Sequence, residues 1–200
     1  MAKTSREVLE FLAQLEVLHP TKEQLANTPQ PVYEHLICLT DPEEMELVIR
    51  QYANSRSGII PYNLAAAVSY NETTFSTRLL FLLLSLRREN LDSDLILAYL
   101  NALRYHSRKN SAEVKRYSET VRNVVKRSLE YDGPARELVH SQLVDFFFSL
   151  IREELFLDLF DRESITALRQ TIAAMADPSP DLQSDKKELL SILDRYSSAS

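Results

Sequence analysis

The sequence predicts an all-α fold, either a single-domain bundle of about 8–10 helices or an irregular array of helical hairpins. Glycine content is the first observation behind this prediction, since the 200 residues include only Gly58 and Gly133. Tight hairpins between strands depend on glycine, so this composition disfavours sheets. The second and third observations are apolar residues that recur at helical spacing along most of the chain and helix-capping sequences in front of them.

The first part of the chain predicts three short helical segments. Thr4-Ser5-Arg6-Glu7 is a capping box that opens a helix ending before Pro20. Thr21-Lys22-Glu23-Gln24 is a second capping box, which opens a short helix. Pro29 and Pro31 predict a turn followed by the start of another helix, because proline is tolerated in the first helical turn.

The next segment contains the least certain element. Asp41-Pro42-Glu43-Glu44 combines a cap, a proline and first-turn acids, so a helix should run from there to about Asn54. Residues 55–71 fit an extended connector, a short buried strand or a short helix that begins at Pro61. Helix is the prediction. We predict one domain over residues 1–200. The stretch 55–72 is the only plausible boundary if the chain has two domains.

The remaining helices follow from the same signals. Their connectors are short, which favours antiparallel packing of neighbours. The tail at 197–200 should fray. The predicted helices are 74–89, 95–106, 111–131, 134–160, 163–176 and 184–196.

The helix predicted at 134–160 is expected to be the core of the fold. Its apolar side chains cover about 200° of the helix circumference, which is wide enough to contact neighbours on two or three sides. Phe146, Phe147 and Phe148 fall within this arc, and packing in the core is the simpler interpretation. The alternative is that Phe147 or Phe148 anchors a partner, as exposed aromatics do at interfaces.

A basic segment at residues 104–127 stands between two acidic regions. It carries eight Lys and Arg against two Glu, a net charge of +6, whereas residues 1–103 have −5 and residues 128–200 have −7, which sum to the net −6 of the chain. Three interpretations stay open: a solvated face with internal ion pairs, a contact with an acidic protein surface, or binding of nucleic-acid phosphates. The candidate partner-binding residues on it are Arg108, Lys109, Lys115, Arg122 and Lys126.

Catalytic, cofactor and metal chemistry are not predicted. Cys38 is the only cysteine, the four histidines stand in no ligand spacing, and no phosphate-binding loop is present. One metal alternative is a stripe of Glu154, Asp158 and Asp161 along a continuous helix. The longest apolar stretch, Leu79 to Leu86, is too short to span a bilayer, so no membrane association is expected.

A short resemblance exists near the start of the chain. Leu12-Ala13-Gln14-Leu15, Thr21-Lys22-Glu23-Gln24-Leu25 and Pro29-Gln30-Pro31-Val32-Tyr33 resemble the opening of outer-kinetochore calponin-homology domains. The resemblance implies a helix, a turn and a helix. It does not continue after residue 40, so no function is inferred from it.

These observations predict a non-catalytic helical interaction module, meaning an adaptor, scaffold or regulatory subunit that binds another protein or itself. The alternative is a regulator that binds nucleic acid through residues 104–127. The lone cysteine and the absence of an apolar signal sequence at the start favour a reducing compartment, the cytoplasm or nucleus.

Overall fold

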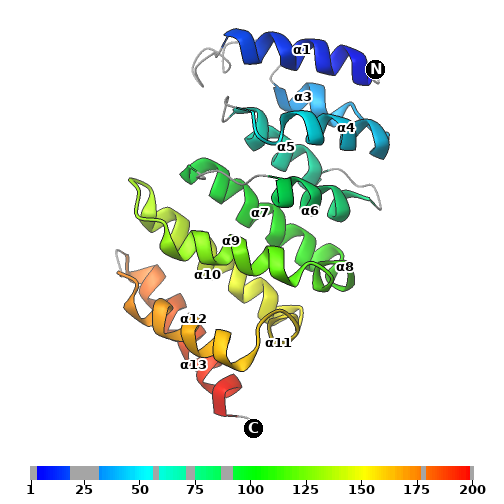
Figure 1. Cartoon of the computed structure of the whole chain (residues 1–200). Helices are drawn as coiled ribbons and strands as arrows, with labels where there is room; N and C mark the ends of the chain where they lie inside the picture. Colours follow the sequence, from blue (N-terminus) through cyan, green and yellow to red (C-terminus); the bar gives the residue numbers. More distant parts are fainter. Residues whose placement is uncertain are drawn as a thin grey trace. The chain divides into compact units, whose positions relative to one another are not determined.

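The computed structural model describes residues 4–18, 32–55, 59–70, 75–86, 92–176 and 179–198. In these ranges the chain forms helices joined by turns and contains no strand, which confirms the all-α fold (Figure 1). None of the described helices is long and apolar enough to cross a membrane. The helices group into two compact units, Met1–Ala102 and Leu103–Ser200. The division falls inside α7 (Ser93–Lys109), and the stretch 55–72 lies within the first unit; the single domain stays a prediction.

The first unit is a set of short helices packed on one another. Helix α3 packs on α5, α5 on α6, α6 on α4, and α1 on both α3 and α4. The residues 55–71 contribute a helix and not a strand, as predicted, although it begins two residues before Pro61. The unit also contains the first part of α7; its other helices are α1 (Ser5–Leu18), α3 (Val32–Ile37), α4 (Pro42–Tyr52), α5 (Ile59–Tyr70) and α6 (Ser76–Leu86).

Two helix starts in this unit have the predicted caps. The backbone amide of Thr4 donates to Glu7 Oε2 at 2.8 Å and the amide of Glu7 donates to Thr4 Oγ1 at 3.4 Å, which is a reciprocal capping box. Asp41 Oδ1 accepts from the amide of Glu43 at 2.8 Å at the start of α4. The capping box predicted at 21–24 and the turn at Pro29 lie outside the described residues.

The second unit contains the end of α7 and the remaining helices. Helix α9 packs on α10 and α11, α10 packs on α11 and α13, and α12 packs on α13. Figure 1 shows α12 and α13 side by side at the C-terminal end. The helices are α8 (Ser111–Lys115), α9 (Ser118–Glu130), α10 (Arg136–Arg152), α11 (Phe156–Leu159), α12 (Arg162–Ala174) and α13 (Pro180–Ser198).

The predicted continuous helix at 134–160 is wrong, because α10 ends at Arg152. The amide of Leu155 donates to the carbonyl of Leu150 at 2.8 Å and the amide of Glu154 donates to that of Ile151 at 3.1 Å. This pair of bonds is a Schellman motif, which requires a left-handed residue after the helix. Glu154 is that residue, with φ at 57°. A chain reversal therefore occurs without glycine, and the next turn forms the separate helix α11.

The predicted helix at 111–131 is also interrupted. The amides of Arg116 and Tyr117 donate to the carbonyls of Glu113 and Val114 at 3.1 and 3.0 Å, so the chain makes tight turns before α9 begins at Ser118. At the C-terminus, α13 starts at Pro180 and continues to Ser198, which is longer at both ends than the predicted helix. The structure includes Ser197 and Ser198 in α13, and their hydroxyls donate to the carbonyls of Leu193 and Asp194. The fraying expected for 197–200 stays a prediction.

A buried lysine joins α12 to α13. Lys186 is 6% exposed, and its Nζ donates to the carbonyl of Met175 at 2.5 Å. Met175 follows the last residue of α12, where carbonyls have no partner within the helix. The ammonium group thus stabilises the end of α12, in the position where a positive charge suits the helix dipole.

Candidate functional site

The aromatic side chains of the second unit form an internal cluster. Phe147 is fully buried, with its ring centroid 5.8 Å from Phe156 and 6.4 Å from Phe160. Phe156 in turn stacks on Tyr196 of α13 at 5.9 Å. Phe147 is therefore covered within this unit, because the chain reversal after α10 brings α11 back over it. Its role as a partner anchor stays a prediction. Phe148 is only half-buried.

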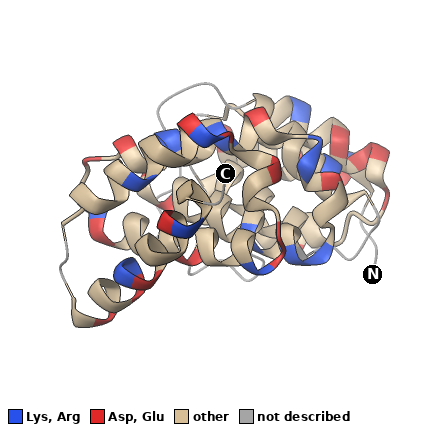
Figure 2. Ribbon diagram, turned by 90° about the horizontal axis from the view of Figure 1, so that it is seen from below, with Lys and Arg blue, Asp and Glu red and all other residues tan. Residues whose placement is uncertain are grey.

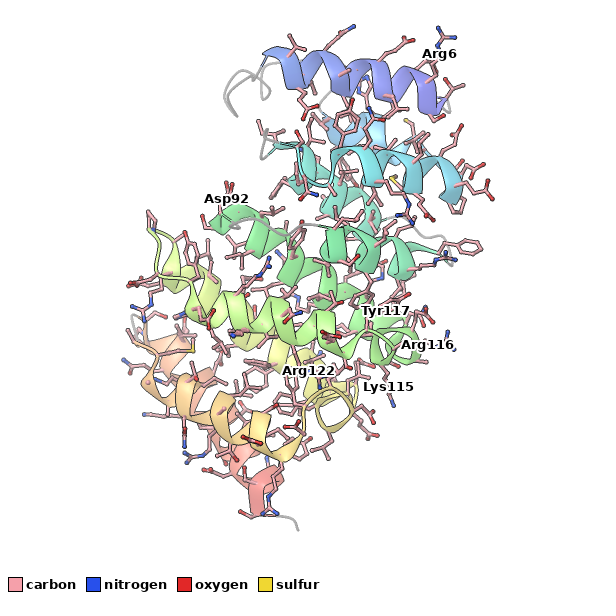
Figure 3. All side chains as sticks on the ribbon, in the orientation of Figure 1. Arg6, Asp92, Lys115, Arg116, Tyr117 and Arg122 are labelled. Carbon is pink, nitrogen blue, oxygen red and sulfur yellow. The ribbon has the colours of Figure 1, made fainter. Side chains whose placement is uncertain are left out.

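Two of the predicted partner-binding residues hold α11 in place. Lys115 Nζ lies 2.6 Å from Asp158 Oδ2, and Arg122 Nη1 donates to the carbonyl of Leu159 at 3.0 Å. Figure 3 shows Lys115 at the end of α8 and Arg122 on α9. The arginine satisfies a carbonyl at the end of a one-turn helix, which has few hydrogen bonds of its own. These two charges thus have a structural role, and the Lys115–Asp158 contact is an internal ion pair, one of the interpretations left open for the basic segment. We call this pair of contacts the α11 clamp.

Most of the other basic residues of the segment 104–127 contact an acidic group or an aromatic ring. Lys126 lies 3.9 Å from Glu130, and Lys109 lies over the ring of Tyr105 at 5.4 Å. The further ion pairs are Arg104–Asp145 at 3.3 Å and Arg116–Glu113 at 3.0 Å. Arg108 and Arg127 are exposed, and within the part of the chain that the structure describes they have no ion pair. Figure 2 shows the same mixing of basic and acidic positions along the helices.

The three carboxylates of the metal alternative have separate environments. Glu154 is in the left-handed turn, and Asp158 pairs with Lys115. Asp161 Oδ1 accepts from the amide of Ser164 at 2.8 Å, and this hydrogen bond lowers the pKa of the Asp161 carboxyl. Because the helix ends at Arg152, the stripe that the metal alternative requires does not form. Over the described ranges no group of three or more His, Cys, Asp or Glu side chains is placed to hold a metal ion.

His140 ties α10 to the inner face of α9. The imidazole is buried and interacts with the backbone of Leu129, and among the residues that the structure describes its Nε2 has no hydrogen-bond partner. Burial, with a smaller contribution from the positive charge of Arg136, lowers the pKa of His140. The side chain is therefore neutral at pH 7 and acts as a packing residue.

A groove lies between α9 and α12, with a volume of about 490 Å³. The side chains at its base are apolar: Val125, Leu168 and Phe160 are each at least nine-tenths buried and Leu129 is half-buried. The α9 wall carries the charged residues Arg122, Lys126 and Glu130. The α12 wall carries the small residues Ser164, Ala167 and Thr171. We call this feature the α9–α12 groove.

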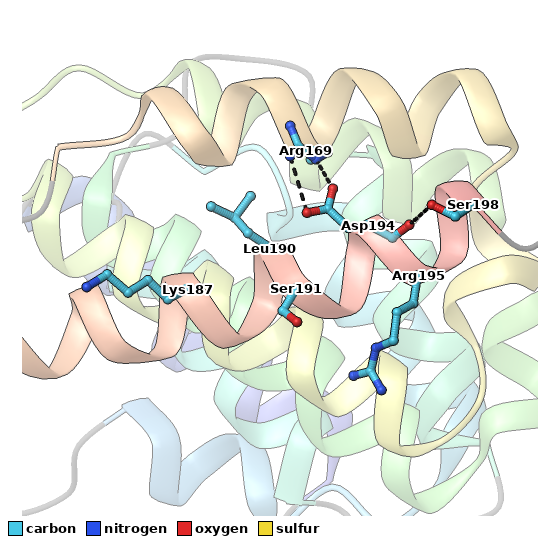
Figure 4. A pocket seen from close by; sticks show the side chains of 7 residues that line it. All are labelled: Arg169, Lys187, Leu190, Ser191, Asp194, Arg195 and Ser198. Carbon is cyan, nitrogen blue, oxygen red and sulfur yellow. Dashed lines mark hydrogen bonds and ion pairs between the residues drawn. The ribbon is translucent and has the colours of Figure 1, made fainter.

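A second hollow follows α12 and α13 and has paired charges (Figure 4). The guanidinium group of Arg169 donates to both carboxylate oxygens of Asp194, which lowers the pKa of Asp194 and raises that of Arg169. Among its lining residues, only Leu190 is apolar. Since an interaction site needs apolar surface as well as charge, the α9–α12 groove is the better candidate.

The sequence identified one wall of this groove. Arg122 and Lys126 were predicted as partner-binding residues, and both line it. Ala167 and Thr171 were not singled out. Their only signal is small size on consecutive turns of an amphipathic helix, which is common in helices that bind nothing.

Comparison of the chain with protein-family models gives no match, and comparisons with curated proteins and with solved structures give none either.

Proposed function

We propose that this protein is a non-catalytic helical module that binds another protein, as an adaptor, scaffold or regulatory subunit, and that the α9–α12 groove is its docking site. The observation that supports this most is the apolar base formed by Val125, Leu129 and Leu168 between a charged and a small-residue wall. A recess that combines apolar surface with a polar rim is typical of protein-binding sites.

The proposed lack of catalysis rests on the sequence, whose cysteine and histidines stand in no catalytic spacing. The proposed location is the cytoplasm or nucleus. Cys38 is the only cysteine, so the chain cannot form an internal disulfide, and proteins of reducing compartments usually have none.

One observation supports nucleic-acid binding as a second candidate. Arg108 and Arg127 expose guanidinium groups, and phosphate contacts need such groups. The first candidate is favoured because the α9–α12 groove adds an apolar base to its charged residues, which a protein partner needs and phosphate contacts do not.

The experiment is affinity capture from native lysate by the full chain, with and without nuclease, followed by mass spectrometry. Ala167→Trp fills the groove from the exposed surface of α12, and Ala173→Trp places the same side chain on an exposed part of the same helix outside the groove. We expect to capture a protein that the wild type and Ala173→Trp retain and that Ala167→Trp does not. Treatment with nuclease should leave its retention unchanged. Retention that depends only on nucleic acid supports the second candidate. If no captured protein depends on the groove, the proposed function is wrong.

A further inference from the structure

The nature of the groove walls restricts what binds there; this inference rests on the proposed function. Both walls are helices, whose backbone groups bond within the helix, so the groove offers mainly side chains. The described residues contain no strand edge to which an extended segment could add. An α-helix, which satisfies its own backbone N–H and C=O groups, is therefore the occupant that suits such a groove best.

The dimensions of the groove fit a short helix. The α9 wall extends from Arg122 to Glu130, which at 1.5 Å per residue is about 12 Å, or roughly two helical turns. On the other wall, Ser164, Ala167 and Thr171 are spaced by one turn. Small side chains at this spacing allow the backbone of a third helix to approach α12 closely.

The charge of the groove differs in sign from that of the chain. Arg122 and Lys126 stand one turn apart on the α9 wall, whereas the whole chain has a net charge of −6. Arg122 uses one N–H for the carbonyl of Leu159, and a guanidinium group has five. The Lys126 side chain is 72% exposed and its pair with Glu130 is long, at 3.9 Å. Both cations can therefore donate hydrogen bonds to carboxylates of a partner, and Glu130 repels acids at the other end of the groove.

We infer that the α9–α12 groove binds an acidic amphipathic helix of another protein. Its carboxylates lie against Arg122 and Lys126, and its apolar side chains, one turn apart, lie on Val125, Leu129 and Leu168. The Glu130 end of the groove receives a neutral or basic residue of the same helix.

The test is selection from a display library of stabilised helical peptides with randomised surface positions. The full chain is the target. Peptides that also bind the Ala167→Trp variant are removed by counter-selection, because they bind outside the groove. We expect the enriched peptides to combine Asp or Glu with Leu, Ile or Phe at helical spacing. Their binding to the purified chain, measured by fluorescence anisotropy, should weaken as salt rises.

Two variants of neighbouring residues make the charge test specific. Lys126→Glu should lower the affinity of an enriched peptide by about 5- to 10-fold, since it replaces an exposed attraction with a repulsion. Arg127→Glu makes the same charge change on the same helix outside the groove and should leave the affinity within about twofold. Arg122 is not substituted here because its loss also breaks the α11 clamp.

Each other outcome contradicts the inference. Peptides that depend on the groove but lack acids, or that bind Lys126→Glu equally well, overturn it and leave the proposed function standing. The same holds if no peptide depends on the groove while the lysate capture finds a groove-dependent protein. Self-association that disappears with Ala167→Trp, seen by analytical ultracentrifugation, makes a second copy of this chain the occupant and also overturns it.

Discussion

The basic residues around α9 divide into two groups that look the same in the sequence. Lys115 and Arg122 contact α11 and stabilise the fold, whereas Lys126 and Arg127 extend into solvent. All four lie on the flanks of amphipathic helices. The difference arises from the chain reversal at Glu154, because it brings Asp158 and Leu159 to the first group only. A basic segment in a sequence is thus no measure of free positive surface until the opposing acids and carbonyls are known.

The largest expected effect comes from the aromatic cluster that supports α11. Phe156→Ala should lower the free energy of unfolding by about 3–5 kcal/mol, because it leaves a cavity against Phe147, Phe160 and Tyr196. Leu157→Ala is the control, since Leu157 is on the same helix but 60% exposed; it should change stability by less than about 1 kcal/mol. Chemical denaturation measures both. Equal effects of the two variants would contradict the described position of α11.

The next effect separates the two groups of basic residues directly. Arg122→Met keeps most of the alkyl chain but leaves the carbonyl of Leu159 without its donor, so stability should fall by about 1–2 kcal/mol. Lys126→Met loses only a long, exposed ion pair and should change stability by about 0.5 kcal/mol or less. If both variants unfold at the same denaturant concentration, Arg122 has no clamping role.

A smaller effect of opposite sign is expected at the chain reversal. Glu154→Gly should raise the free energy of unfolding by about 0.5–1 kcal/mol, because glycine adopts the left-handed conformation without steric cost. Glu153→Gly, one residue earlier at φ −88°, should be destabilising because it only adds freedom to the unfolded chain. Thermal unfolding of the two variants measures the difference. A destabilised Glu154→Gly variant would argue against the Schellman motif.

The pH dependence of the free energy of unfolding tests whether His140, at the inner face of α9, is buried in its neutral form. The folded-state pKa of His140 lies below its usual value, so between about pH 7 and pH 5 the unfolded chain binds a proton that the folded chain does not. Stability should therefore fall as the pH decreases through this range. His140→Leu removes this contribution, and its stability should fall less over the same range. The acid Asp132, which opposes the shift, stays in place in both proteins. An identical pH profile of the two proteins would exclude His140 as the source.

Two helix starts were predictable to the residue because their capping signals are local. The caps at Thr4 and Asp41 depend on residues within three positions, and both form as expected. The helix ends at Arg152 and Lys115 were not predictable, because no glycine or proline marks them and Glu154 adopts a conformation that its residue type disfavours.

The candidate site was predictable in part for the same reason. The cationic wall of the groove, with Arg122 and Lys126, follows from charge and helical spacing. The opposing wall comes from α12, and which helix faces α9 depends on the two unforeseen interruptions. The burial of Phe147 has the same origin, since its partners Phe156 and Phe160 lie beyond the reversal.

The burial of the Lys186 ammonium group makes its chemical reactivity a measure of how often α13 opens. Among the described lysines, Lys186 is buried, whereas Lys109, Lys115, Lys126 and Lys187 are exposed to reagents. An amine-acylating reagent should therefore modify Lys186 only when α13 lifts away from Met175, and the rate of that slow labelling measures how often the C-terminal helix opens.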